Sequence, residues 1–181
     1  MTDKSDYPKF LITIYTVTDR LAIKESICKM IIKFFGKKKG DGDGADESSK
    51  IEFINLVEPL VQLVSRVKEI GNSQQKVCAL SVMAIVNMCN FSEDIKDIFL
   101  QKNGFQIIMD LLDSKDEDIM LNCLRLIMTL INKKKGDTSQ IGRTLGEEKD
   151  YAMIRRLIHL VKDETGINYT HYCKDVYYYA I

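Results

Sequence analysis

The side chains that most often carry out chemistry are sparse in this sequence. His159 and His171 are its only histidines, twelve positions apart. No serine or cysteine stands in a nucleophile-elbow pattern, and no H-E-x-x-H pattern is present, so a histidine base has no partner group at a usable spacing. We therefore expect no catalytic residue and no enzymatic activity.

Metal and cofactor patterns are equally weak. The cysteines never form a C-x-x-C pair, which leaves a zinc site without local ligand spacing; they are Cys28, Cys78, Cys89, Cys123 and Cys173. Asp41, Asp43 and Glu52 have the spacing of a calcium loop, but Ala45 replaces an oxygen ligand and Asp46 replaces the glycine of the turn. We expect no metal and no cofactor.

Composition narrows the class of protein. Lys and Arg number 26 and Asp and Glu also number 26 in 181 residues. This neutrality argues against nucleic acid as the partner. The N-terminus lacks the basic and apolar regions of a signal peptide, and the apolar windows are too short to insert into a membrane. Several cysteines lie inside apolar runs, as reduced thiols do. We expect a cytoplasmic protein.

Apolar residues recur at helical spacing through most of the chain, and two polar, glycine-containing loops interrupt the pattern at 36–49 and 133–149. Residues 1–181 are interpreted as a single domain. The glycine at 104 predicts a sharp turn between two helices, and Pro59 is expected to divide the segment 50–70. The predicted helices are 8–17, 20–35, two within 50–70, 73–89, 95–102, 105–112, 116–131, 155–161 and 167–180.

Two of these helices repeat the same pattern. The segment Ala84-Ile85-Val86-Asn87-Met88 aligns with Leu126-Ile127-Met128-Thr129-Leu130 at a period of 42 residues. A helical repeat of about 40–47 residues is typical of an α-solenoid, whose units bury their apolar faces by stacking on one another. Such folds usually bind other proteins.

Residues 77–131 resemble an armadillo repeat array. The pieces that carry the resemblance are the short helix 95–102, Gly104, the pair Leu111-Leu112 that ends the next helix, and the Ala-Leu-x-Asn-Leu-like segment that contains Asn87. The resemblance implies an all-α fold, a right-handed α-solenoid of armadillo/HEAT-like helical repeats. Armadillo and HEAT units both remain possible.

The resemblance also implies a binding face. In that family the long third helices line a concave groove, where an asparagine at the Asn87 position hydrogen-bonds the backbone of an extended peptide. This chain has no tryptophan, and Met83 stands where members that import nuclear cargo carry one, which argues against basic cargo. The partner-binding positions implied are Lys33, Asn87, Thr129 and Tyr178 and, one turn earlier, Lys29, Met83, Arg125 and Lys174. Their basic members favour an acidic partner.

Simpler interpretations stay open. Asn87 is alternatively a polar residue satisfied inside the stack, and the basic residues are alternatively a solvated face. The Tyr-rich end at 177–181 implies a covering partner, self-association into a homo-oligomer or larger complex, or a longer chain.

The function favoured by the sequence is a non-catalytic protein–protein interaction scaffold or assembly subunit, which binds a protein partner through the third-helix face, the Tyr-rich C-terminal end, or both. One alternative is a receptor groove for an extended acidic peptide, and another is a nucleic-acid-binding helical repeat. A ciliary or cytoskeletal assembly is the alternative to a general cytoplasmic location.

Overall fold

The computed structural model describes residues 7–36, 53–66 and 71–131, and every element of regular secondary structure in this part of the chain is a helix. The expected all-α class is confirmed for these residues. The predicted helices 155–161 and 167–180, the loop 133–149 and all of the loop 36–49 except Gly36 lie outside them. The helices are α1 (Tyr7–Val17), α2 (Leu21–Phe35), the short 3-10 helix η2 (Phe53–Leu56), α4 (Val57–Val64), α5 (Asn72–Phe91), α6 (Glu93–Gln101), α7 (Gly104–Leu112) and α8 (Glu117–Ile131).

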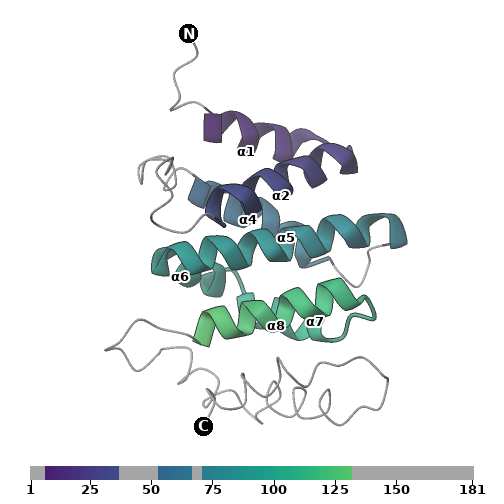
Figure 1. Ribbon diagram of the computed structural model, residues 1–181, viewed down its shortest axis with the longest axis vertical. Helices are drawn as coiled ribbons and strands as arrows, with labels where there is room; N and C mark the ends of the chain where they lie inside the picture. Colours follow the sequence, from purple (N-terminus) through teal and green to yellow (C-terminus); the bar gives the residue numbers. More distant parts are fainter. Residues whose placement is uncertain (1–6, 37–52, 67–70, 132–181) are drawn as a thin grey trace.

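The described helices form two layers (Figure 1). The longer helices α2, α5 and α8 lie side by side, and α5 makes its most extensive contacts with the other two. Behind them, α4 packs against α5 and α7 packs against α8, while α4, α6 and α7 contact one another. α1 lies beside α2 at one end of the row.

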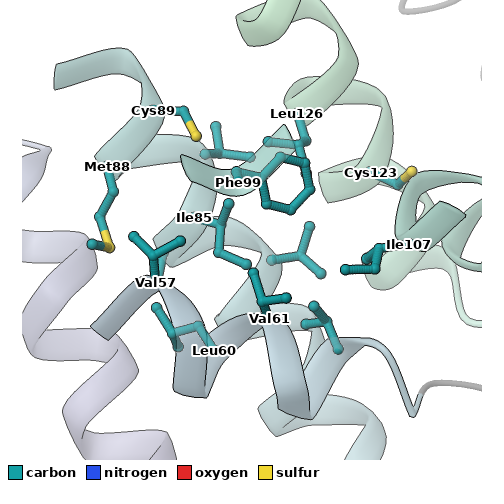
Figure 2. Close-up of a cluster of buried hydrophobic side chains, with 14 of the residues drawn as sticks. Val57, Leu60, Val61, Ile85, Met88, Cys89, Phe99, Ile107, Cys123 and Leu126 are labelled. Carbon is teal, nitrogen blue, oxygen red and sulfur yellow. The ribbon is translucent and has the colours of Figure 1, made fainter. Parts of the chain in front are cut away.

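A single apolar core runs between the layers. Figure 2 shows its centre, where Leu60 of α4, Ile85 of α5 and Phe99 of α6 meet. Ile107 of α7 and Leu126 of α8 close it from the other side. Removing an aliphatic or aromatic side chain of this kind from water stabilises a fold by about 1.5–3 kcal/mol, so burial between the layers is the main force that holds the helices in place.

Pro59 does not divide the segment where the sequence analysis expected. The change of helix type falls between Leu56 and Val57, and Pro59 lies in the first turn of α4. Proline is tolerated there because the first turn has no intrahelical use for its missing N–H. The break therefore comes before the proline, not at it.

Local chemistry fixes the ends of the later helices. Asn103 adopts the left-handed conformation with φ 61° immediately before α7, and Gly104 is the first residue of that helix. The expected sharp turn between the two helices is present, but Asn103 makes it rather than the glycine. The Oδ1 atom of Asp116 accepts a hydrogen bond of 2.9 Å from the backbone N–H of Ile119. This bond satisfies one of the free donors at the start of α8.

Candidate partner-binding face

The structure describes six of the eight expected partner-binding residues, and they come in pairs from the three stacked helices. Lys174 and Tyr178 lie outside the described residues. The pairs are Lys29 and Lys33 on α2, Met83 and Asn87 on α5, and Arg125 and Thr129 on α8. We call the surface formed by α2, α5 and α8 at these positions the third-helix face.

Met83 and Arg125, which are 42 residues apart, meet across α5 and α8. The guanidinium Nη1 of Arg125 lies 3.9 Å from the Sδ atom of Met83, and both side chains are half-buried. The same Nη1 donates a hydrogen bond of 3.1 Å to Oδ1 of Asn122. Arg125 is therefore held in a defined position at the seam between the two helices.

Asn122 is the buried residue behind this arrangement. Its Nδ2 donates a hydrogen bond of 3.0 Å to the carbonyl oxygen of Ala79 on α5, while its Oδ1 accepts from Arg125. One amide thus connects α8 to α5 and orients Arg125. The sequence analysis did not identify Asn122, and the only signal was a single amide within an apolar stretch.

Asn87 makes the corresponding connection between α5 and α2. Its Nδ2 donates a hydrogen bond of 3.1 Å to the carbonyl oxygen of Ile32, which also accepts from the N–H of Gly36 at 2.9 Å. Its amide thus bonds to the last turn of α2. This bond supports the interpretation of Asn87 as a polar residue satisfied within the stack.

The remaining expected residues differ in how accessible they are. Lys29 and Lys33 are exposed on α2. Thr129 is only 7% exposed, so its side chain packs within the molecule. The accessible members of the face are therefore concentrated on α2 and on the seams beside α5.

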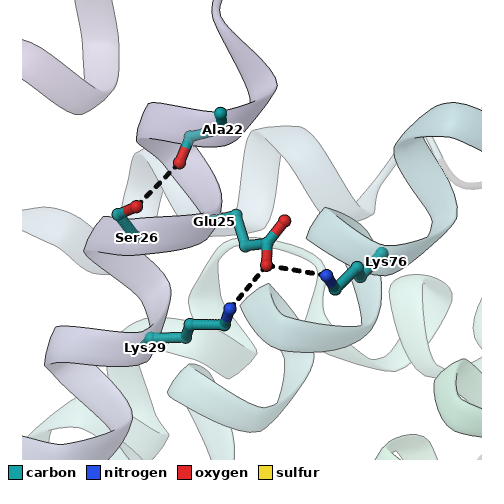
Figure 3. Close-up of polar contacts among 5 residues, drawn as sticks. All are labelled: Ala22, Glu25, Ser26, Lys29 and Lys76. Carbon is teal, nitrogen blue, oxygen red and sulfur yellow. Dashed lines mark hydrogen bonds and ion pairs between the residues drawn. The ribbon is translucent and has the colours of Figure 1, made fainter.

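A polar cluster joins α2 to α5 at one of these seams (Figure 3). The Oε1 atom of Glu25 lies 2.6 Å from Nζ of Lys29 and 2.8 Å from Nζ of Lys76. The hydrogen bond from Lys29 and, to a smaller extent, the one from Lys76 hold the pKa of the Glu25 carboxyl below its ordinary value. The sequence analysis missed Lys76, although it stands seven residues before Met83 and thus on the same side of the helix.

Charge is distributed unevenly along the described residues. Up to the end of α5, they include seven Lys or Arg and three Asp or Glu. From 92 to 131 they include four Lys or Arg and eight Asp or Glu. The first part is therefore net basic, and α6 to α8 with their connecting turns are net acidic. A negatively charged ligand is favoured near α2 and α5 and opposed near the acidic elements.

The described cysteines are inert in this fold. Cys28, Cys78, Cys89 and Cys123 are all buried free thiols. Burial raises the pKa of Cys78 and of Cys89 to about 12, so neither thiol is a nucleophile near neutral pH. Within the described ranges, no three His, Cys, Asp or Glu residues are grouped so as to hold a metal ion.

No helix among the described residues has the length and apolar character needed to cross a membrane. Comparison of the chain with protein-family models gives no match, and comparison with curated proteins gives none either.

Proposed function

We propose that this protein is a non-catalytic interaction scaffold that binds a protein partner through the third-helix face. The observation that carries the proposal is the contact between Met83 and Arg125. Two residues at equivalent places in a 42-residue repeat meet on adjacent long helices, as they do when repeat units stack in register. A right-handed armadillo-like α-solenoid is the arrangement that we propose for the chain.

The chemistry of the face suits binding better than catalysis. Its described residues combine exposed ammonium groups on α2 with a half-buried thioether and guanidinium at the seam of α5 and α8. Arginine and methionine are enriched at protein interfaces because each combines a large contact area with adaptable or directional bonding. Such a mixture is suited to a partner segment that carries both acidic and apolar side chains.

Cytoplasmic location belongs to the same proposal, with a ciliary or cytoskeletal assembly as a specific case. The four buried thiols are unpaired, which fits a reducing compartment. The Tyr-rich end at 177–181, which lies outside the described residues, is the second surface that we propose for a partner or for another copy of the chain.

Site-specific photo-crosslinking in cells tests the third-helix face. A photoreactive residue replaces Lys33 or Met83 on this face, and in the control proteins it replaces Gln62 on α4 or Asp97 on α6, which are exposed. We expect the first two proteins to capture a common partner that the controls do not capture. Equal capture from both sets, or capture by the controls alone, would contradict the proposal.

A deletion of residues 174–181 separates the two proposed surfaces. If the same partner is still captured at Lys33 and Met83 after the deletion, binding takes place at the third-helix face. If the deletion alone abolishes capture, the Tyr-rich end is the docking surface and the third-helix face is not.

A further inference from the structure

We infer that the lysines around Glu25 form the binding site for an acidic side chain of a partner protein segment, and that Glu25 competes with this side chain for them. The site consists of Glu25, Lys29, Lys33 and Lys76, which we call the α2–α5 lysine cluster. The inference rests on the proposed scaffold function and specifies the chemistry of its partner.

The geometry of the cluster is that of a site for a carboxylate. The Nζ atoms of Lys29 and Lys76 come from different helices and converge on the same oxygen, Oε1 of Glu25, at 2.6 Å and 2.8 Å. Because both nitrogens contact the same oxygen, the distance between them cannot exceed the sum of these two distances. Two ammonium groups this close repel one another even in water. An anion between them is therefore favoured, and in the isolated protein Glu25 supplies it.

The lysines have capacity for a second anion. The side chains of Lys29 and Lys76 are 57% and 69% exposed, and each ammonium carries three N–H donors. Lys33 lies one helical turn beyond Lys29, is exposed, and forms no ion pair with any described residue. The cluster thus keeps a net positive charge that Glu25 only partly neutralises.

An exposed apolar side chain lies on α2 about one turn before Lys33. Met30 follows Lys29 in α2 and, unusually for a large apolar residue in this structure, is 38% exposed. A flexible thioether beside exposed lysines suits a segment in which acidic residues are interspersed with apolar ones. The occupant that we assign is therefore an acidic protein segment.

Nucleic acid fits the same charges less well. A polynucleotide presents a continuous row of phosphates and needs a basic surface that extends along its backbone. Here the basic region gives way to α6 to α8, where the described residues from 92 onward include eight acidic and four basic side chains. This acidic portion would repel a backbone that continued past α5.

The role of Glu25 distinguishes a binding site from a solvated ion pair. An incoming carboxylate must share Lys29 and Lys76 with Glu25 or displace it. The substitution Glu25→Gln removes the competing charge and keeps the size and shape of the side chain, so it should strengthen binding of an acidic ligand. Glu58→Gln is the matched control, because Glu58 forms an exposed ion pair of 3.1 Å with Lys102 between α4 and α6.

Fluorescence anisotropy with the full chain tests the inference, with a fluorescein-labelled peptide of five Glu-Ala repeats as the probe at low salt. One exposed charge pair changes an affinity by up to about fivefold. We expect Glu25→Gln to tighten binding and Lys33→Ala and Lys76→Ala each to weaken it, all within that range. Glu58→Gln and Lys102→Ala should leave binding unchanged. Circular dichroism establishes that each variant is folded at the assay temperature.

Four results would overturn the inference. They are no binding of the peptide, equal tightening by Glu25→Gln and Glu58→Gln, weakening by Glu25→Gln, and tighter binding of a ten-nucleotide single-stranded DNA than of the peptide. The last would favour a nucleic-acid-binding repeat. Crosslinking at Met83 separates this inference from the scaffold function. If the protein captured there binds the lysine-cluster variants as well as it binds the unaltered chain, the scaffold function stands and only the role of the cluster is excluded.

Discussion

The ring of Phe99 and the Cα atom of Gly104 lie in direct contact at the junction of α6 and α7. A Cβ atom on Gly104 would stand 2.5 Å from Cε1 and 2.7 Å from Cδ1 of Phe99, and 2.7 Å from the Phe99 carbonyl oxygen. Phe99 is fully buried at the centre of the core, so its ring has no space into which to move. The glycine is required by this close approach of the two helices.

We expect Gly104→Ala to lower the free energy of unfolding by about 1–3 kcal/mol, the usual cost of forcing additional atoms into a packed core. Gly71→Ala is the matched control, because no atom lies within 4 Å of the Cβ it would introduce, and its backbone at φ −73° and ψ 163° suits any residue. Because Gly71 is the N-cap of α5, where alanine is less favourable than glycine, we expect Gly71→Ala to have a small cost, below that of Gly104→Ala. Urea denaturation measures both, and equal effects would contradict the packing argument.

Asn122→Ala should destabilise the fold more than Asn87→Ala. Asn122 is buried and bonds both to Ala79 and to Arg125, so its loss breaks two hydrogen bonds, one of them to a buried residue of α5. Asn87 is half-buried, and the Ile32 carbonyl that it contacts keeps its bond from Gly36. We expect a cost of about 1–3 kcal/mol for Asn122 and about 1 kcal/mol or less for Asn87. The opposite order in urea denaturation would contradict this account.

Much of the fold could be predicted from the sequence because its signals are local. The apolar periodicity of α8 predicted a helix that the structure confirms. The turn expected between α6 and α7 is also present, although Asn103 makes it and Gly104 is already the first residue of α7. The position of the break near Pro59 was predicted wrongly, because a proline in a first turn and a proline that ends a helix look the same without the neighbouring packing.

The candidate site was less predictable because it depends on contacts between helices. The repeat spacing gave Met83 and Arg125 equivalent positions in two repeat units, and the structure adds that their side chains are in contact. Spacing alone does not show that Asn87 bonds to Ile32, that Thr129 is buried, or that Lys76 shares Glu25 with Lys29. These relationships arise from the rotation and offset of α2, α5 and α8, which no single segment encodes.

Glu93→Gln should destabilise the protein more than Glu58→Gln, although each breaks one ion pair. Glu93 pairs at 2.9 Å with Lys96, whose side chain is only 5% exposed, whereas the partner of Glu58 is 43% exposed. When Glu93 is replaced, the buried ammonium of Lys96 loses the charge of that carboxylate and gains little contact with water in exchange, so the folded state is destabilised. Because Glu93 itself is half exposed, we expect about 1 kcal/mol for Glu93→Gln and less than about 0.5 kcal/mol for Glu58→Gln. Thermal unfolding of both variants provides the comparison.

The buried thiols should be protected from alkylation in the native protein. Four of the five cysteines lie in the core, so we expect at most one thiol to react rapidly with iodoacetamide at pH 8, and all five to react in urea. Mass spectrometry of the alkylated protein counts the modified residues. Rapid modification of Cys89 or Cys123 without denaturant would show that the core opens readily.

The same thiols predict a loss of stability at alkaline pH. Cys78 and Cys89 ionise near pH 9 in the unfolded chain, but burial raises their pKa to about 12 in the folded protein. Between these values the unfolded state releases protons that the folded state retains, so the stabilisation present below pH 9 is lost as the pH rises toward 12. We expect Cys78→Ala and Cys89→Ala each to flatten the decline in the free energy of unfolding over this range, whatever their effect at pH 7.

The slope of the free energy of unfolding against pH is the diagnostic quantity, because a cavity left by the missing sulfur shifts stability equally at every pH. Urea denaturation at intervals from pH 8 to pH 11 measures it, and slopes identical to that of the unmodified protein would mean that these thiols are hydrated in the folded state.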